Sequence, residues 1–169
     1  MNVHEAIRSR RSIRAYEPRA VPEAALRRVL EAARLAPSAK NRQAWRFIVV
    51  RDEPLRRELA RAAHDQDFVA EAPVCLAFCA TEDEYVMSCG QKAGPVDTSI
   101  ALAYATLAAV EEGLVTCWLG AFDEPQARKL LGVPAGARVI GLTPLGYPAE
   151  QPAARPRRKF EDVVGFEKW

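Results

Sequence analysis

Apolar positions recur with a helical period in the first third of the chain. Residues 22–35 carry an apolar stripe that includes Leu26 and Val29, and Pro22 suits the first turn of a helix. Pro37 follows this stripe and ends the helix. Two shorter helices are predicted as well, one over residues 3–10 and one over residues 54–63 behind an Asp52 cap.

Apolar runs without a helical period predict strands. Residues 73–80 form the most continuous of these runs and indicate a strand buried on both faces. Three further strands are predicted over residues 45–50, 114–119 and 138–144. These strands alternate with helices along the chain, so the sequence predicts one sheet with helices packed against it.

The longest predicted helix covers residues 95–112, about 27 Å at 1.5 Å per residue. It is apolar around nearly its whole circumference, which favours a place at the centre of the fold or at a subunit interface. Gly113 ends it in the usual C-terminal position. A last helix is predicted behind an Asp123 cap and through Leu131.

Composition narrows the class of protein. A chain of 169 residues is expected to form a single domain. The net charge of +2, from 24 basic and 22 acidic residues, is too balanced for a general nucleic-acid binder. The longest charge-free apolar stretch, residues 98–110, is too short to cross a bilayer, and the N-terminus lacks the apolar segment of a signal peptide. We therefore expect a cytoplasmic protein with neither a nucleic-acid nor a membrane partner.

The cysteines do not indicate a metal site or a disulfide. None forms a Cys-x-x-Cys pair, and Cys75 and Cys79 are separated by about 13 Å along a strand. The two histidines are not clustered with them. We expect four small, reduced core residues and no metal: Cys75, Cys79, Cys89 and Cys117.

Two basic clusters carry candidate chemistry. Residues 10–14 hold three guanidinium groups and a hydroxyl, a donor set that can surround a phosphate. The alternative is a solvated, Arg-rich helix end. The second cluster, residues 155–159, lies in a polar, Pro-rich segment that starts near Pro148. Apolar residues near its end favour an arm that docks onto a partner subunit, and the alternative is a solvated tail.

Three connections between elements add candidate ligand contacts. In residues 37–45, polar side chains between a helix end and a strand could hydrogen-bond a planar heterocycle, although a helix-terminating turn is the simpler interpretation. In residues 117–123, Gly120 and Ala121 would let the backbone approach a ligand closely, and an ordinary tight connection is the alternative. In residues 144–148, Gly146 between two prolines predicts a turn.

Together and in this order, these segments resemble the FMN-dependent nitroreductase family in its short, single-domain form. The resemblance rests on the cluster at 10–14, the polar segment at 37–45, Asp97 with the long Ala-rich helix, and the two glycine-containing connections. It covers almost the whole chain. The family commonly has Pro where Ala44 stands.

The resemblance implies an α+β fold. Its sheet would be mixed but mainly antiparallel, with flanking helices, a long central helix, and a C-terminal arm from about residue 148 exchanged between the subunits of a homodimer. It also implies a tightly bound FMN at the dimer interface, with NADH or NADPH as a transient reductant. A small planar acceptor, such as a nitroaromatic or a quinone, would be reduced in a ping-pong reaction by hydride transfer through flavin N5.

The resemblance assigns roles to residues of this chain. Arg10 and Ser12, with Arg157 or Arg158, would hold the FMN phosphate, and Arg14 would lie near the pyrimidine edge of the flavin. The backbone of Gly120 and Ala121 would lie against N5, and no side chain would act as a catalytic residue. The full set of predicted cofactor contacts is Arg10, Arg11, Ser12, Arg14, Pro37, Ser38, Ala39, Asn41, Gln43, Leu119, Gly120, Ala121, Arg157 and Arg158.

Other functions remain open at this point. Relatives on the same scaffold dehalogenate aromatics or fragment flavin, usually under a lid, and residues 81–94 provide only a short one. A non-catalytic FMN-binding or anion-binding protein is a further alternative. The chain has no Gly-x-Gly-x-x-Gly sequence, so a lasting Rossmann-type site for the nicotinamide is not expected.

Overall fold

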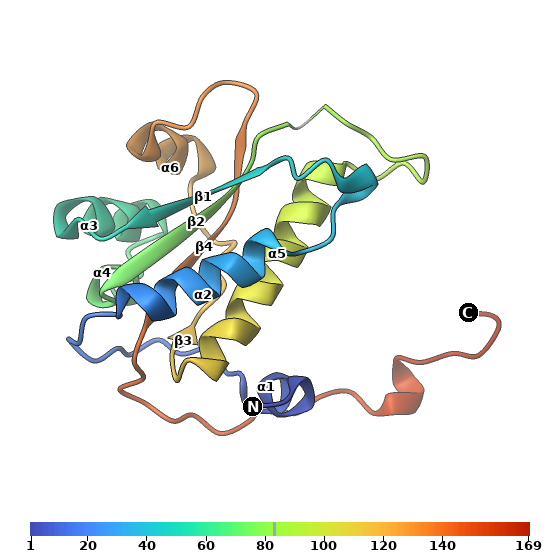
Figure 1. Cartoon of the computed structure of the whole chain (residues 1–169), viewed down its shortest axis with the longest axis horizontal. Coiled ribbons are helices and arrows are strands. Elements are labelled where there is room, and N and C mark those ends of the chain that lie inside the picture. Colours follow the sequence, from blue (N-terminus) through green and yellow to red (C-terminus); the bar gives the residue numbers. More distant parts are fainter. Residues whose placement is uncertain (83) are drawn as a thin grey trace.

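A four-stranded antiparallel sheet separates two layers of helices in the computed structural model, which describes residues 1–82 and 84–169 (Figure 1). The strand order is β1-β2-β4-β3. The central pair is the most extensive, with Val74 opposite Leu145 at one end and Ala80 opposite Arg138 at the other. The strands are β1 (Trp45–Val50), β2 (Val74–Ala80), β3 (Val115–Thr116) and β4 (Arg138–Gly146).

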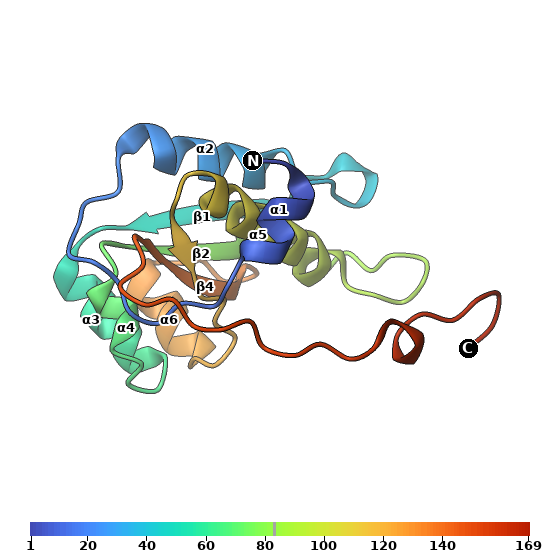
Figure 2. The same ribbon diagram turned by 90° about the horizontal axis from the view of Figure 1, so that it is seen from below.

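The helices cover the sheet on both faces (Figures 1 and 2). One face carries α2 (Glu23–Arg34) and α5 (Ala93–Glu111), and α1 (Val3–Ser9) lies near the C-terminal end of α5. The other face carries α3 (Glu53–Ala62), α4 (Phe68–Glu71) and α6 (Glu124–Leu131).

Strand β2 supplies the centre of both cores, because alternate residues of a strand point to opposite faces. Leu76 and Phe78 pack with α2 and α5, whereas Cys75 and Ala77 pack with α3 and α6. All seven residues of the strand are buried. This confirms the strand predicted over residues 73–80 and explains its continuous apolar sequence.

The predicted α+β fold is confirmed, with corrections to individual elements. The strand predicted over residues 114–119 is only Val115–Thr116, and Leu119 is joined to β4 by a separate bridge to Leu142. The turn predicted at Gly146 is wrong, because β4 continues through this residue. A Cβ at Gly146 would lie 2.8 Å from Pro73 Cδ, so the glycine serves close packing inside a strand.

Helix α5 is longer than the charge-free stretch on which the sequence argument rested. Its 19 residues are long and apolar enough, by length and composition alone, to cross a membrane, and buried core helices meet the same test. One side is in the core, where Ala101 and Leu102 are fully buried. The opposite side leaves Val96 and Tyr104 partly exposed. The central position expected for this helix is confirmed.

The C-terminal arm first runs along the body of the molecule, where Glu150 and Arg157 line a cavity beside α1, and its end then extends away from the body (Figure 2). The arm contains only a short 3₁₀ helix, η2 (Phe160–Asp162), among the elements described there. Its aromatic side chains Phe160, Phe166 and Trp169 are exposed. The exchange of this arm between subunits stays a prediction.

Three of the four cysteines lie in the core, and one does not. Cys75, Cys79 and Cys117 are buried, whereas Cys89 is exposed, which corrects the prediction that all four are core residues. Cys89 occupies a turn closed by the hydrogen bond from Gly90 N to Met87 O, 2.8 Å long. This turn belongs to the short segment 81–94 considered as a lid, of which Asp83 lies outside the described residues.

Candidate functional site

The segment after α1 is held extended between two other parts of the chain. Its Ile13 N–H donates to Thr116 O of β3 at 3.1 Å, and Ala149 N donates back to Ala15 O at 3.0 Å. The Tyr16 hydroxyl donates to Ile13 O at 2.8 Å, and burial raises the pKa of Tyr16 far above its ordinary value, so it remains a donor. The backbone of the basic cluster is therefore fixed.

The two basic clusters meet in one cavity of about 550 Å³. Its walls come from α1, from the residues that follow α1, and from the start of the C-terminal arm. The groups that can bind an anion there are Arg8, Arg10, Ser12, Arg14, Arg155 and Arg157. The Glu150 carboxylate also lines the cavity, so residues from opposite ends of the sequence form a single site with a net positive charge.

Two of the arginines predicted to contact the cofactor already donate hydrogen bonds to backbone carbonyls. The Arg11 guanidinium lines the same cavity but donates to Arg8 O at 2.6 Å and to Arg10 O at 2.9 Å, so it caps the carbonyl end of α1. Arg158 donates to Asp162 O at 2.7 Å in η2 and is not among the residues lining the cavity. Of the alternatives Arg157 and Arg158, the structure places Arg157 in the cavity.

Arg14 has defined surroundings. Its backbone N–H donates to Glu150 Oε1 at 2.5 Å, and its guanidinium carbon lies 5.9 Å from the centre of the Phe68 ring. Burial raises the pKa of the neighbouring Cys117 thiol, while Arg14 and Arg10 oppose that rise. Arg14 therefore lines the anion cavity and also affects the pKa of the thiol of Cys117, which follows β3.

The predicted polar segment forms a strained loop around the 3₁₀ helix η1 (Ala39–Asn41). Lys40, Asn41 and Gln43 have φ values of 52°, 54° and 52°. Left-handed backbone costs a non-glycine residue about 1–2 kcal/mol. Ser38 Oγ accepts from Gln43 N at 3.0 Å, and Gln43 Nε2 donates to Asn41 Oδ1 at 3.2 Å. Such strain concentrates at ligand sites.

A hydrogen bond to helix α5 also holds this loop in place. The Ala39 N–H donates to Asp97 Oδ2 of α5 at 3.1 Å. Asp97 is buried, at 4% exposure. The loop side chains themselves remain accessible, with Ser38 partly exposed and Asn41 and Gln43 exposed. The structure therefore presents hydrogen-bonding groups to solvent on a rigid base.

The third predicted segment leaves β-structure at Leu119. A Cβ at Gly120 would meet no atom within 4 Å in the described part of the chain, so the backbone there is open to a ligand. The next residue is held by Gln66, whose Nε2 donates to Ala121 O at 3.2 Å. Gln66 follows His64 and Asp65, which both have left-handed backbone, with φ values of 59° and 56°.

One chain does not bring all the predicted residues together. The loop around Ser38 is attached near the N-terminal end of α5, through Asp97. The basic cluster lies near the other end, where Arg11 and Val110 line the same small cavity. The 13 residues from Asp97 to Val110 correspond to about 20 Å of helix. Within one chain, the loop around Ser38 and the basic cluster therefore lie in separate regions (Figure 1).

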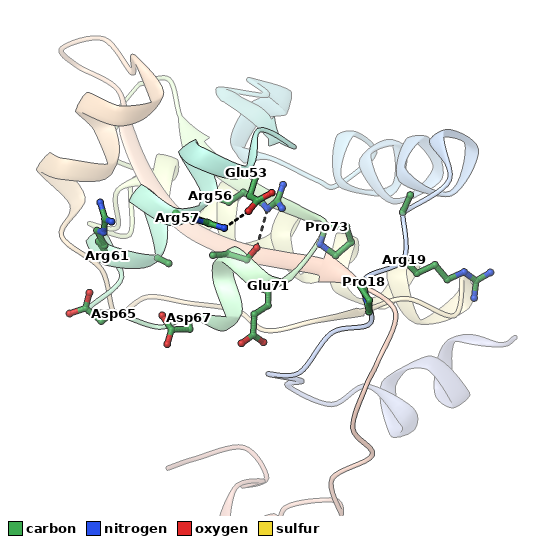
Figure 3. A pocket seen from close by; sticks show the side chains of 13 residues that line it. Pro18, Arg19, Glu53, Arg56, Arg57, Arg61, Asp65, Asp67, Glu71 and Pro73 are labelled. Atoms are coloured by element: carbon green, nitrogen blue, oxygen red, sulfur yellow. Dashed lines mark hydrogen bonds and ion pairs between the residues drawn. The ribbon is translucent and has the colours of Figure 1, made fainter.

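A larger cavity, of about 730 Å³, lies elsewhere, against α3 and α4 (Figure 3). It contains none of the predicted site residues. Basic and acidic side chains alternate around it, Arg57 is paired with Glu53, and Arg56 Nε donates to Ala70 O at 3.4 Å. Its mixed charges show no preference for an anion, so we place the functional site at the smaller cavity, where arginines outnumber the single acidic residue among the described residues of the lining, Glu150.

Comparison with known proteins settles the family. The sequence profile of the nitroreductase family matches residues 7–66 and 61–147. The chain belongs to the nitroreductase family. The match covers the N-terminal basic cluster, the strained loop and the open backbone at Gly120, and the relatives cover the C-terminal arm as well.

Individual relatives of the chain within this family are named as flavin or nicotinamide oxidoreductases. The NADH dehydrogenase of Thermus thermophilus is 35% identical, over 97% of this chain and 95% of its own. The FMN reductase [NAD(P)H] of Bacillus subtilis is 33% identical, over 95% of this chain and 72% of its own. The structure of NADPH:FMN oxidoreductase from Vibrio harveyi, complexed with NAD⁺, superposes with a TM-score of 0.92 at 27% identity, covering 100% of this chain and 78% of that one.

Three polar residues that support the site are absent from the sequence prediction as contacts: Asp97, Gln66 and Glu150. Each binds backbone far away in sequence, at Ala39, Ala121 and Arg14 respectively. Asp97 stood out only as part of the family pattern. Local sequence carries no signal for hydrogen bonds of this kind.

Proposed function

We propose that this chain is a cytoplasmic, homodimeric, FMN-dependent NAD(P)H oxidoreductase that reduces small planar acceptors such as nitroaromatics and quinones. The observation that carries the proposal is the cavity in which Arg10 and Ser12 meet Arg157. A phosphate dianion fits this donor set, because charge-assisted hydrogen bonds from guanidinium groups are among the strongest available. The family and its flavin-reducing relatives support FMN as the group that carries this phosphate.

The remaining predicted residues would hold the rest of the cofactor. Ser38, Asn41 and Gln43 offer donors and acceptors to the ring or the ribityl chain. Arg14 would lie near the pyrimidine edge, where its positive charge favours the electron-rich reduced form of the ring. The open backbone from Leu119 to Ala121 would lie beside N5, with no side chain at Gly120 to block the approach.

When bound, FMN would supply the two-electron chemistry, taking up hydride at N5 and releasing it there. The protein's part is to bind and orient, so the mechanism needs no nucleophile or dedicated acid. The nicotinamide and the acceptor would use the same exposed face in turn, which makes NADH or NADPH a transient reductant.

The site would be completed by a second copy of the chain. The ring-binding loop and the phosphate-binding cavity lie at opposite ends of α5. A two-fold axis can place the loop of one subunit near the cavity of the other, since both surfaces are then present twice. The exposed side of α5, with Val96 and Tyr104, and the aromatic side chains of the arm supply apolar surface for this contact.

The absorbance spectrum of the purified full-length protein tests the proposal. We expect a yellow protein with about one FMN per chain, bleached by NADH or NADPH without oxygen and reoxidised by nitrofurazone or a benzoquinone. Flavin released by heat should be FMN. A colourless protein that fails to take up added FMN would contradict the proposal.

The same preparation separates the alternatives. Oxygen-dependent loss of the flavin spectrum during NADH oxidation would indicate flavin fragmentation, and release of halide from a halogenated phenol would indicate dehalogenation. Stable FMN binding without NADH or NADPH oxidation would indicate a flavin-binding protein that is not an enzyme.

A further inference from the structure

The start of the strained loop around Ser38 is bound by a buried carboxylate in α5. Asp97 is 4% exposed, and its Oδ2 atom accepts the Ala39 N–H at 3.1 Å. The two residues are 58 positions apart in sequence. Burying a carboxylate is costly unless the group is hydrogen-bonded, so its contact with the loop is part of what makes its burial tolerable.

The hydrogen bond from Ala39 to Asp97 lies where it can affect the placement of the residues that follow. Ala39 is the first residue of η1, and the left-handed residues Lys40, Asn41 and Gln43 follow it directly. Hydrogen bonds within the loop run from Gln43 to Ser38 and to Asn41. Further along, Arg42 is ion-paired with Glu82, and its guanidinium carbon lies 4.5 Å from the centre of the Tyr85 ring. The internal bonds set the shape of the loop, Arg42 attaches its end to the segment after β2, and Asp97 attaches its start to α5.

We propose that Asp97 is a positioning residue for flavin binding. It would hold Ser38, Asn41 and Gln43 where they meet the ring and ribityl part of the cofactor, without touching the cofactor itself. The inference rests on the proposed function. Asp97 lies far from the basic cavity, so its removal should weaken binding of the ring end and leave the phosphate end intact.

Two ligands separate these ends. Riboflavin carries the ring and ribityl chain but no phosphate, so the ratio of its affinity to that of FMN reports on the phosphate contacts alone. Titration of the flavin-depleted, full-length protein, followed by flavin fluorescence, gives both dissociation constants. The same titration of Arg10→Ala should weaken FMN only.

For Asp97→Ala we expect both affinities to fall about tenfold, since a buried backbone donor loses its acceptor. The affinity ratio of the two ligands should stay as in the wild type. Asp97→Asn keeps an oxygen acceptor at the same position and should retain affinity within about threefold. Asp52→Ala is the matched control, because Asp52 also accepts a backbone N–H, from Leu55 at 2.9 Å, but caps the remote helix α3.

If Asp97→Ala does not fold, a variant of Ala39, the donor of the same hydrogen bond, still tests the proposal. Ala39→Pro removes the donor, and proline is tolerated at the first residue of a helical turn after an extended residue, which Ser38 is, with φ −141° and ψ 156°. We expect Ala39→Pro to weaken both flavins as Asp97→Ala does, and the double variant to show no further loss.

Several results would overturn the proposal. One is an Asp97→Ala protein that melts at a lower temperature but binds both flavins as the wild type does, which would make the residue merely structural. Additive losses in the double variant would show that the two groups act separately. A wild type that binds neither flavin would instead contradict the proposed function, which is a different outcome from an Asp97 variant without effect.

Discussion

The arginines of this chain differ in what their guanidinium groups are already bound to. Arg10, Arg14 and Arg157 face a shared cavity, Arg11 donates to two backbone carbonyls, and Arg57 is paired with Glu53. A guanidinium that already serves the protein contributes less to a ligand. Composition alone cannot separate these roles, because the residue type is the same in each.

Replacement of Arg10 tests this division. Arg10→Ala should weaken FMN binding about 10–100-fold, the loss expected for a hydrogen bond to a charged group. Arg57→Ala removes an equal charge from an exposed ion pair and should leave FMN binding unchanged. Arg11→Ala should mainly lower the melting temperature, since it uncaps α1. Isothermal titration with FMN and thermal melts measure these effects, and equal losses of FMN affinity in all three would contradict the assignment.

Arg14 should act on the electronics of the cofactor rather than on its retention. With the positive charge removed, Arg14→Ala should have a lower midpoint potential for the bound flavin, because the reduced ring is more electron-rich. A redox titration with an indicator dye at saturating FMN gives this potential. Loss of FMN equal to that in Arg10→Ala, at an unchanged potential, would refute the separate role.

The thiols give a pH-dependent prediction. Burial raises the pKa of Cys75 to about 12 and that of Cys79 to about 11. Unfolding exposes both thiols, so between about pH 9 and 11 the unfolded chain binds fewer protons and stability should fall as pH rises. Chemical denaturation at pH 8 and pH 10 measures this change in stability.

The exposed thiol gives a separate prediction. At pH 8, a thiol reagent should label Cys89 rapidly, and Cys89→Ser should abolish that fast phase.

At the scale of elements, β4 packs closely against its neighbours at Gly146. A Cβ at Gly146 would lie 2.8 Å from Pro73 Cδ and 3.0 Å from Tyr16 Cδ1. Both neighbours are themselves constrained, Tyr16 by its hydrogen bond to Ile13. The strand therefore has little room to adjust.

Gly146→Ala should destabilise the protein by about 1–3 kcal/mol, the usual cost of overpacking a core. Gly120→Ala is the matched control, since its new Cβ would meet no described atom within 4 Å and the residue is outside the left-handed region. Urea denaturation compares the two. A Gly146→Ala protein as stable as Gly120→Ala would show that the strand does relax.

Elements with a clear pattern in their own sequence were predictable, and elements that depend on contacts with residues far away in sequence were not. The helix over residues 23–34 carries its own apolar stripe, so its sequence suffices. Helix α4, with 4 residues, is too short for any period to be visible. Because Gly146 lies between two prolines, its sequence predicts a turn. Only its contacts with Pro73 and Tyr16, far away in sequence, explain its place in a strand.

At the scale of the whole molecule, the separation of loop and cavity makes a prediction about mixed dimers. An Arg10→Ala chain is damaged in the cavity, and an Asn41→Ala chain in the loop. In a heterodimer one site would carry both defects and the other neither. Random reassortment of equal amounts should therefore restore about a quarter of the wild-type FMN sites.

Mixing after mild dissociation, followed by assay of NADH oxidation, measures this recovery. Each variant alone, treated in the same way, is the control. Activity that stays at the average of the two variants would show that each site is built from one chain.

For the candidate site, the sequence was enough to predict residues that line the cavity but not the residues that support them. Arg10, Ser12 and Arg157 belong to charged clusters that stand out in the sequence, and the structure brings them to one cavity. Asp97, Gln66 and Glu150 act through backbone groups 58, 55 and 136 residues away. Only folding creates those pairs, so no spacing rule could have found them.

The exposed side of α5 also bears on how the protein is made. If the proposed dimer forms, a newly made chain exposes Val96 and Tyr104, together with the aromatic arm, as an apolar surface until a second copy covers it. A cofactor bound across two chains would favour the paired form by mass action. The yield of well-folded protein should therefore rise with riboflavin supply and fall with the rate of synthesis, which makes vitamin status a determinant of solubility.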